Sequence, residues 1–404
     1  MKKLLIASAA LAMVAGTAQA QSSVTVYGLV DIGYAASNNQ STNASGVVST
    51  TKQKNTGNGD GNLATSRLGF RGTEDLGGGM RANFVLEYDL IDAGVGGNGG
   101  ATASKTIADN ANSTSNTGGF GSRYSWVGLE DAKLGQLRLG RQEQSIHSVV
   151  LGGSAGAGNN VTGAVYSAGM NASANDSAVR PHMVFVNRAI TYISPTFNGL
   201  RVEVQTAKQD INNAGTTTYA KETGGSLKYA AGKFAAAYGF ATSDVDSTVA
   251  FTITGWTAAN DVAGTAANTT SADLKTKQQA ISASYDFGMV RVFALQTQRK
   301  ETVSTSGSLN ADTKNTEIGV QAPMGKTVLF ASAFDGSRKG ASTSALATGN
   351  ADTSGMQVGA IYNLSKRTAA YAIHGTQEIK GTGVTDNDLK LKTTTTAVGV
   401  RHSF

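Results

Sequence analysis

Residues 81–89 read RANFVLEYD, and this short segment decides the fold class. Its even positions are apolar or aromatic and most of its odd positions are polar: Ala82, Phe84, Leu86 and Tyr88 against Arg81, Asn83, Glu87 and Asp89. Successive side chains of a β-strand point to opposite faces, so the segment has one apolar and one polar face. The same period appears in 67–71 (RLGFR), 136–139 (QLRL) and 200–205 (LRVEVQ). We expect strands with one face for lipid and the other for water.

The connections between such segments are of two kinds. Seven are short and most contain Gly, Pro or Asp, as tight turns require: 74–79, 131–135, 195–199, 230–233, 286–288, 323–326 and 364–367. The others are long and rich in Asn, Ser, Thr and Gly, for example 37–62, 92–119 and 243–275. This asymmetry is typical of a membrane barrel with short periplasmic turns and long extracellular loops.

Counting the turns predicts the number of strands. Seven short turns join fourteen strands, and the opening segment 24–34 and the closing segment 393–404 bring the total to sixteen. The first and last strands then end on the same side, where they can pair and leave no edge. We therefore predict a closed, all-β, antiparallel transmembrane barrel, wide enough at sixteen strands to hold an aqueous channel.

The ends and the composition agree with export to a membrane. Lys2 and Lys3, the apolar segment 4–14 and the small-x-small site at 18–20 predict a signal peptide cleaved after Ala20. Residues 21–404 then form a single barrel domain of 404 − 20 = 384 residues. Past this leader, nothing reaches the roughly 18 consecutive apolar residues of a membrane-spanning helix. The chain has no Cys, which excludes disulfides and thiolate metal sites.

Two other classes of protein are disfavoured. A secreted β-sandwich array or β-solenoid would show a fixed repeat or similar loops at both ends, and the chain shows neither. The net charge of +6 is carried by basic residues scattered singly among the strands, which argues against a nucleic-acid partner. Charged residues make up only 15% of the chain, below the roughly 25% of a soluble domain.

Several motifs resemble those of the Gram-negative general porins, in particular the β-proteobacterial type. They are SVTVYGLVD (23–31), SRLGFRGTEDLG (66–77), WVGLE (126–130), LGRQ (139–142), YISP (192–195) and VGVRHSF (398–404). Together they run from one end of the mature chain to the other. The resemblance implies a sixteen-stranded homotrimeric barrel, with a third loop folded into the lumen as its constriction. It also implies that the terminal aromatic, Phe404, is a signal read by the barrel-assembly machinery.

The expected inward loop is 143–186, the longest connection at 186 − 143 + 1 = 44 residues. A loop this long without evident structure is usually functional or disordered. In many porins this loop carries carboxylates that face basic residues on the wall. Here Asp176 is the one acid between Gln144 and Val186, although Glu143 lies at the loop's root.

Charges on the water-facing positions are the candidate pore residues, because a narrow pore with low-dielectric walls concentrates the field of the charges that line it. The set is Arg67, Arg71, Arg81, Arg123, Arg138, Arg201, Glu87, Asp89 and Glu143. For any one arginine the alternative is a residue wetted by bulk water or paired structurally with a carboxylate. The arginine-rich face and the acid-poor loop predict a preference for anions.

Catalytic and metal-binding constellations are weak. His147 lies near Ser145 and Ser148, but no nucleophile elbow surrounds them, and His182 has no paired-histidine spacing for a metal. We therefore expect neither an enzyme nor a bound metal or cofactor. Four aromatic residues fit the interfacial girdles of a membrane barrel: Trp126, Tyr34, Tyr88 and Tyr124.

The sequence thus predicts an outer-membrane channel of a Gram-negative bacterium through which small hydrophilic solutes and ions diffuse passively. Its expected partners are two further copies of the chain, the lipids and lipopolysaccharide of the outer membrane, and the assembly machinery. Two alternatives remain open: a substrate-specific channel, and a structural or adhesive barrel that acts through its loops.

Overall fold

The structure is a computed structural model of the whole chain. It describes residues 23–42, 46–58, 61–90, 120–156, 158–167, 182, 184–213, 216–247, 274–303, 309–340, 350–381 and 389–404. The predicted signal peptide and most of the connections 92–119 and 243–275 lie outside these residues. None of the described helices is long and apolar enough to cross a membrane.

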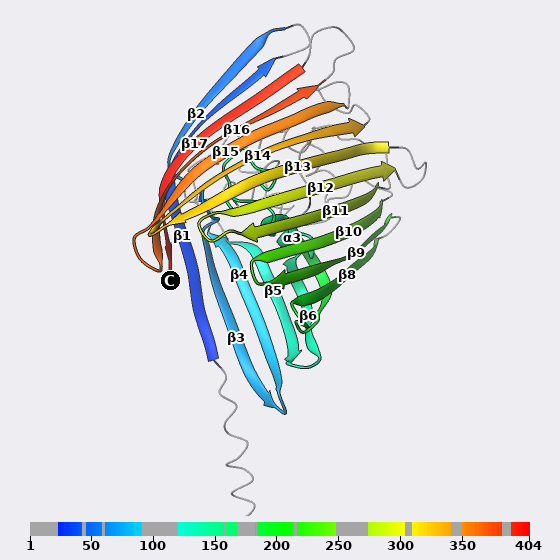
Figure 1. Cartoon of the computed structure of the whole chain (residues 1–404). Helices are drawn as coiled ribbons and strands as arrows, with labels where there is room; N and C mark the ends of the chain where they lie inside the picture. Colours follow the sequence, from blue (N-terminus) through cyan, green and yellow to red (C-terminus); the bar gives the residue numbers. More distant parts are fainter. Residues whose placement is uncertain are drawn as a thin grey trace, which may run out of the picture.

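Antiparallel strands make up almost all of the described chain (Figure 1). The strands are β1 (Ser23–Thr42), β2 (Val48–Asn58), β3 (Arg67–Gly77), β4 (Met80–Leu90), β5 (Phe120–Asp131), β6 (Gly135–Glu143), β7 (Phe185–Ile193), β8 (Leu200–Asn213), β9 (Thr216–Ala231), β10 (Phe234–Ser247), β11 (Leu274–Asp286), β12 (Arg291–Val303), β13 (Leu309–Met324), β14 (Thr327–Gly340), β15 (Ala351–Asn363), β16 (Thr368–Gly381) and β17 (Leu389–Ser403). A short helix, α3 (His147–Gly152), follows β6.

These seventeen segments fill sixteen positions of the barrel. Strands β2 and β3 both pair with β1, β2 along its second half and β3 along its first, so together they occupy one position. The predicted sixteen-stranded closed barrel is confirmed. One prediction about a loop is wrong, because most of the connection 37–62 is strand: β1 runs to Thr42 and β2 covers Val48–Asn58. Polar Thr, Asn, Gln and Lys side chains face outward on this hairpin, so its strands lack the apolar alternation on which the prediction relied.

The barrel closes where β17 pairs with β1. The register runs from Leu29 opposite Ser403 to Thr42 opposite Lys390. Beyond it, the backbone amides of Gly28 and Phe404 each donate to the other's carbonyl at 3.1 Å. A Cβ on Gly28 would lie 2.3 Å from the Phe404 ring, so only glycine leaves room for that ring. No strand edge is left unpaired at this seam.

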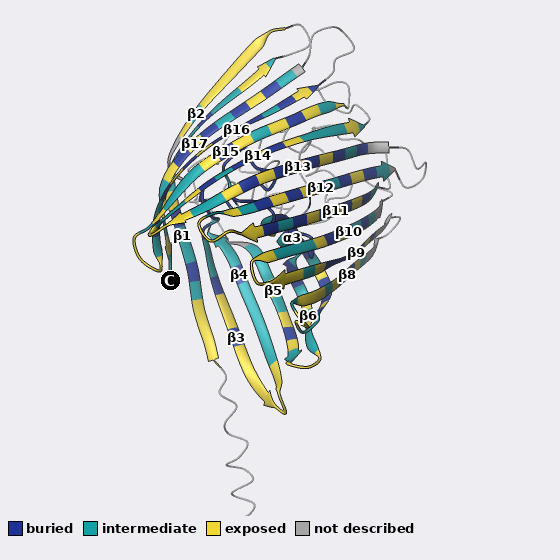
Figure 2. Cartoon of the chain, in the orientation of Figure 1, coloured by how far each residue is buried: buried dark blue, intermediate teal, exposed yellow. Residues whose placement is uncertain are grey.

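Burial alternates residue by residue along most strands, as Figure 2 shows on β11 to β16. The outer face is apolar and exposed, with Val127, Leu137 and Ile281 between 42% and 54% exposed. The inner face is polar and largely buried on β9 to β16, for instance at Gln278 and Gln357. All seven predicted short turns join strands at one end of the barrel. The faces therefore match the predicted division between lipid and water.

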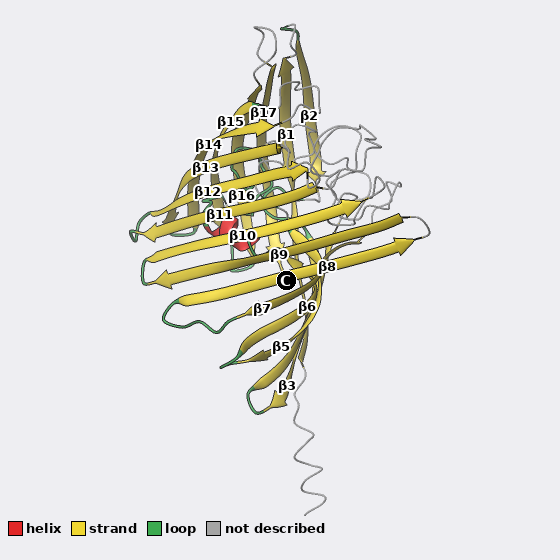
Figure 3. Ribbon diagram, turned by 90° about the vertical axis from the view of Figure 1, so that its right-hand side faces the viewer, coloured by secondary structure: helices red, strands yellow, loops and turns green. Residues whose placement is uncertain are grey.

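The third long connection folds into the barrel, as the resemblance implied. Helix α3 contacts β10, β11 and β12 (Figure 3). After it, the described residues up to Ser167 follow the inner wall across β13 to β16 and reach residues 61–66. The loop contains a helix where the sequence showed no evident structure. This segment covers one side of the lumen and leaves the side formed by β1 and β3 to β8 for the pore.

Candidate functional site: the pore lining

The predicted charged residues lie on the wall opposite the inward loop. Arg67 and Arg71 are on β3, Arg81, Glu87 and Asp89 on β4, Arg123 on β5, Arg138 and Glu143 on β6, and Arg201 on β8. Their neighbours along each strand, such as Phe70, Leu139 and Val202, are apolar and exposed on the outside. The period-two pattern therefore places the charged side chains inside.

Four of these residues form one ion-pair cluster. Glu87 Oε1 lies 2.7 Å from Arg123 Nε and 3.7 Å from Arg67 Nη1, and Asp89 Oδ1 lies 3.1 Å from Arg123 Nη1. Tyr27 of β1 adds a hydrogen bond from its hydroxyl to Glu87 Oε2 at 3.0 Å. Two guanidinium groups and two carboxylates leave the cluster without net charge.

Arg71 and Arg138 lie against aromatic rings instead of carboxylates. The guanidinium carbon of Arg71 is 5.2 Å from the centre of the Tyr27 ring, and that of Arg138 is 4.4 Å from the Trp126 ring. Arg138 Nε also donates to Gln136 Oε1 at 2.8 Å. In the described part of the chain, neither arginine, nor Arg201, has a carboxylate oxygen within 4.0 Å. Stacking on a ring fixes a guanidinium without neutralising its charge.

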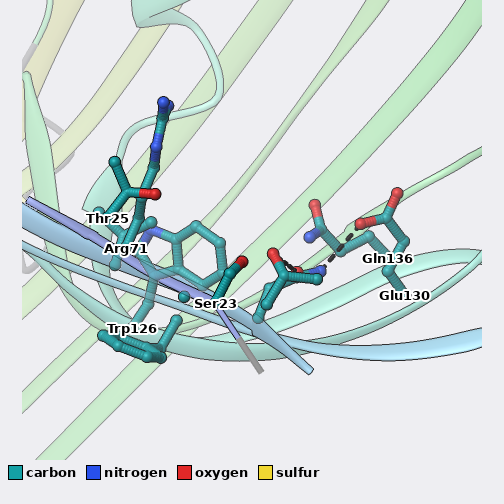
Figure 4. Close-up of a pocket in the computed structure, with 11 residues that line it drawn as sticks. Ser23, Thr25, Arg71, Trp126, Glu130 and Gln136 are labelled. Carbon is teal, nitrogen blue, oxygen red and sulfur yellow. Dashed lines mark hydrogen bonds between the residues drawn. The ribbon is translucent and has the colours of Figure 1, made fainter. Parts of the chain in front are cut away.

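A pocket of about 190 Å³ lies beside Arg71 (Figure 4). Arg71, Trp126 and Gln136 line it, together with Glu130. Asn83 donates to Glu130 Oε2 at 2.9 Å and accepts from Thr73 Oγ1 at 2.9 Å, so the carboxylate is held by an amide. Arg81 is paired in register with Glu130, and no ion pair between the two is formed among the described residues.

The inward loop is held by buried side chains of the opposite wall. Glu317 of β13 is fully buried and accepts hydrogen bonds from Ser154 Oγ and from the Val165 amide, both at 2.6 Å. Gln357 of β15, also fully buried, donates to the Val161 carbonyl at 2.6 Å. The Thr162 carbonyl lies over Gly375 of β16, where an added Cβ would come within 1.7 Å of its oxygen. Close approach at this glycine lets the loop lie flat on the wall.

A second anchor joins the loop to the break between β2 and β3. Asp31 is fully buried, and its Oδ2 accepts from the amides of Leu63 and Ala64 at 2.9 and 2.7 Å. Its Oδ1 accepts from the Tyr371 hydroxyl at 2.6 Å. The Asn160 amide then donates to the Asn62 carbonyl at 2.8 Å. Asp31 therefore organises residues 61–66, on which the tip of the described loop rests.

The root of the loop carries a buried histidine pair that the sequence did not predict. His147 Nδ1 lies 2.7 Å from His182 Nε2, and both side chains are about 3% exposed. Glu143 Oε1 is 3.7 Å from His147 Nε2. Burial lowers the pKa of His147, against the attraction of Glu143. Ser148 donates to the Ser145 carbonyl and not to His147, so no serine–histidine dyad forms.

The structure corrects two predictions and adds residues. Trp126 and Tyr124 do not lie in the interfacial girdles: Trp126 lies under Arg138 in the lumen, and Tyr124 packs edge-on against the buried Phe185. Arg141, which the sequence pattern did not single out, lies 4.9 Å from the Phe185 ring. Its side chain hydrogen-bonds to Asn187 Oδ1 at 2.7 Å. Arg141 is part of the motif at 139–142. A strict two-residue period from Arg138 puts Arg141 on the outer face, but the bulge next to Gly140 shifts the register.

No group of three or more His, Asp or Glu in the described ranges is arranged to hold a metal ion. Asp176, the one acid expected within the inward loop, lies outside the described residues. Within the described residues, the lumen wall thus carries both ion-paired arginines and arginines with no carboxylate partner, facing a loop fixed by buried carboxylates.

Comparison with known proteins agrees with this geometry. The family model described as Gram-negative porin matches residues 7–382. The chain belongs to the Gram-negative porin family. This porin is 30% identical to outer membrane porin protein 32 of Delftia acidovorans, with all of both chains covered. It is 40% identical to an outer membrane porin protein of Bordetella pertussis over 146 residues, 35% of this chain and 34% of the relative.

Solved structures show the same fold. An anion-selective porin from Comamonas acidovorans superposes with a TM-score of 0.63 at 24% identity, covering 95% of this chain and 100% of that one. The trimer form of OmpT from Vibrio cholerae gives 0.59 at 13% identity, covering 95% and 99%. The porin lies in the outer membrane of a Gram-negative bacterium and forms a water-filled channel for passive diffusion of small hydrophilic solutes and ions. Its family and fold are those of a channel and not of an enzyme.

Proposed function

We propose that this porin prefers anions, and that the preference rests on Arg71, Arg138 and Arg201. The observation that carries the proposal is the pairing of charges on the pore wall. The carboxylates Glu87 and Asp89 are matched by Arg67 and Arg123, while Arg71, Arg138 and Arg201, like Arg81 beside the short turn, have no carboxylate within 4.0 Å among the described residues. The porin of the same fold from Comamonas acidovorans is anion-selective, which is consistent with this arrangement.

The size of the effect follows from Coulomb's law. A unit charge about 6 Å from the ion path contributes roughly 0.7 kcal/mol even at the dielectric constant of water, about a threefold change in permeability. A low-dielectric wall strengthens the field, whereas salt weakens it. Three arginines without an ion-pair partner in the described residues therefore suffice for a clear preference at moderate salt.

Reversal potentials across a planar bilayer with a KCl gradient test the proposal. The native porin is expected to give the sign of anion preference, and Arg71→Gln and Arg138→Gln each to lower the chloride-to-potassium permeability ratio by roughly threefold. Lys277→Gln is the matched control, because it removes the same charge from an exposed outer position of β11. Cation preference in the native porin, or an equal shift in the control, would contradict the proposal.

We propose that the remaining candidates also line the pore: Arg67, Arg123, Glu87 and Asp89 form an ion-paired lattice, and Arg81 and Glu143 lie outside this lattice. In this lattice Glu87 offsets the field of Arg123 at 2.7 Å. Glu87→Gln is therefore expected to raise the chloride-to-potassium ratio, in the opposite direction to Arg71→Gln. An unchanged ratio would mean that the lattice lies outside the path of the ions.

We further propose that the porin is a homotrimer in which β3 to β6 face the neighbouring copies. The outer face of these strands carries exposed Val127, Leu129 and Leu139 and, within their described residues, neither Lys nor Arg. Leu129→Lys is expected to lower the trimer fraction in detergent, measured by mass. Val320→Lys, at an exposed outer position of β13, should leave it unchanged.

For the ends of the chain we propose cleavage after Ala20, giving a mature domain of 21–404, and recognition of Phe404 during assembly. N-terminal sequencing of the outer-membrane protein tests the first proposal. For the second, Phe404→Ala should slow assembly in cells; normal assembly would contradict it. Packing of the Phe404 ring over Gly28 supports a further role for this residue at the barrel seam.

A further inference from the structure

The pocket beside Arg71 carries opposite charges at its two ends. Arg71 of β3 is opposite Val85 of β4, and Val85 is opposite Trp126 of β5. Glu130 follows further along β5, next to the short turn. All four side chains line the pocket. Figure 4 shows Arg71 at one end and Glu130 at the other, so a cation and an anion border the same cavity.

The cationic end is fixed in place by an aromatic ring. The guanidinium carbon of Arg71 is 5.2 Å from the centre of the Tyr27 ring, and the Tyr27 hydroxyl is held by Glu87 Oε2 at 3.0 Å. In the described ranges, no carboxylate oxygen lies within 4.0 Å of Arg71. Thr25 stands directly opposite Arg71 on β1 and lines the same pocket. A guanidinium fork beside a hydroxyl donor suits a carboxylate.

The acidic end is held by an amide and also lacks an ionic partner. Glu130 Oε2 accepts from Asn83 Nδ2 at 2.9 Å, and Asn83 Oδ1 accepts from Thr73 Oγ1 at 2.9 Å. Arg81 is opposite Glu130 in the register, but the two form no ion pair within the described residues. This arrangement uses one carboxylate oxygen and leaves Oε1 for a donor such as an ammonium group.

The space between the two ends is lined by neutral side chains. Apart from Arg71 and Glu130, the described residues that line the pocket are all uncharged, and Val85 and Trp126 add apolar surface. Arg138 stacks on the Trp126 ring at 4.4 Å but does not line the pocket. The cavity therefore matches a neutral chain with a charged group at each end.

The strand register sets the spacing of the two charges. Arg71 and Glu130 are two strands apart, about 10 Å, and 130 − 126 = 4 residues apart along the strands, about 13 Å. Their Cα atoms are therefore roughly 16 Å apart, and the two long side chains cover part of this distance. A solute whose charges are adjacent reaches only one end. A linear solute with several carbons between its charges reaches both.

We propose that this pocket binds linear amphoteric solutes, with their carboxylate on Arg71 and their ammonium group on Glu130. The proposal deepens the anion preference proposed above and rests on it for Arg71 as a cation without an ion-pair partner. A simple anion would pair with Arg71 and leave Glu130 unused, and a dianion would bring a second carboxylate against it. Only a solute with both charges complements both ends.

Three six-carbon probes distinguish the two ends of the pocket: 6-aminohexanoate, hexanoate and adipate. They share one carboxylate and end in an ammonium group, a methyl group and a second carboxylate. Binding to the folded porin in detergent is measured by tryptophan fluorescence at constant ionic strength. The chain has two tryptophans, so Trp256→Phe leaves Trp126 in the pocket wall as the reporter. We expect 6-aminohexanoate to bind most tightly.

Charge-removing variants assign each end. Glu130→Gln should weaken binding of 6-aminohexanoate by up to about fivefold, the value of a partly exposed ion pair, and leave hexanoate unchanged. The glutamine keeps an amide oxygen for Asn83. Arg71→Gln should weaken binding of all three probes. Asp335→Asn and Lys277→Gln are the matched controls, because each removes the same charge from an exposed outer position, and both should bind as the native porin does.

Three results would overturn the proposal. They are equal binding of 6-aminohexanoate and hexanoate to the native porin, an advantage of 6-aminohexanoate that persists in Glu130→Gln, and tightest binding of adipate, which marks a general anion site. Reversal potentials in KCl on the same samples test the anion preference separately. A porin that lacks this preference but binds 6-aminohexanoate as expected contradicts the proposed function and not the pocket.

Single-channel current provides a second readout, which a merely structural role of Glu130 would not change. Because 6-aminohexanoate has no net charge, its own passage carries no current, but an occupant beside Arg71 impedes chloride. It should lower the chloride current of the native porin more than that of Glu130→Gln. An uncharged six-carbon diol controls for crowding of the lumen. An equal reduction by the diol, or an equal reduction in the variant, would refute binding in the pocket.

Discussion

Replacing Glu317 with alanine should detach part of the inward loop from the wall. The carboxylate is fully buried and holds the loop at two points eleven residues apart, Ser154 Oγ and the Val165 amide, each at 2.6 Å. Alanine removes both acceptors and leaves two donors unpaired in a buried interface. Because Gln357 and Asn160 still hold the loop between these two points, we expect local opening and not unfolding of the barrel.

The magnitude follows from the two hydrogen bonds. Each bond to a charged group contributes about 1.5–3 kcal/mol, so the closed loop loses roughly 3–6 kcal/mol at this point. Local opening then becomes more frequent by about a hundredfold to ten thousandfold. Amide exchange of a protected group rises by the same factor when opening is fast and reversible.

Hydrogen exchange followed by mass spectrometry on peptides covering 154–167 measures this directly. Protection of the Val165 amide should fall by at least about a hundredfold, while peptides from β10 to β12 stay protected. Asp335→Ala is the control, since that carboxylate is exposed on the adjacent strand β14. Unchanged protection of the Val165 amide, or an equal loss of protection in the control variant, would refute the view that Glu317 holds the loop against the wall.

Three further predictions concern the same loop. Asp31→Ala removes three acceptor contacts of a fully buried carboxylate and should lower the free energy of unfolding by about 3–5 kcal/mol, seen as an earlier thermal transition. Burial in the closed loop lowers the pKa of His147 below its ordinary value of about 6.5. At a pH below 6.5, His147 therefore binds a proton more readily when the loop is open than when it is closed. Loop closure is expected to weaken as the pH falls through this range. The noise of the single-channel current should therefore grow as the pH is lowered from 7.5 to 5, and His147→Gln should abolish this growth. Equal growth in the variant would contradict the prediction. Gly375→Ala pushes against the Thr162 carbonyl and should cost about 1–3 kcal/mol, checked by the same melting assay against Ala372→Gly on the outer face of that strand.

The wall of the barrel could be predicted because its signals are local. Segment 81–89 shows the two-residue period within nine positions, and turns such as 286–288 carry their Asp and Gly within three. These features depend on backbone geometry, which a short stretch of sequence determines almost alone. The strand count and the inward arginines followed from them.

The anchors of the loop could not be predicted, because their partners are far apart in the sequence. Glu317 lies 152 residues from Val165 and Gln357 lies 196 from Val161. In the sequence of its own strand, Glu317 is only one polar residue in an alternating pattern. A water-exposed residue of the pore would give the same pattern. Two features of the wall were missed although their signals are local. The β1–β2 hairpin lacks the apolar alternation that marked the other strands. Trp126 lies in the lumen, but a tryptophan can be placed on either face of such a strand, so its residue type did not decide its position.

The anchoring of the loop also explains the charge of the pore. Asp31, Glu222 and Glu317 are all fully buried, and each is taken up by hydrogen bonds within the wall or to the loop. None of these three acids forms an ion pair with Arg71, Arg138 or Arg201 within the described residues. Of the acids on the pore wall, Glu87 and Asp89 pair with Arg67 and Arg123, Glu203 pairs with Lys228, and Glu130 accepts from Asn83. The same placement of acids that fixes the loop therefore leaves Arg71, Arg138 and Arg201 without an ion-pair partner in the described part of the chain, and the proposed preference for anions rests on this arrangement.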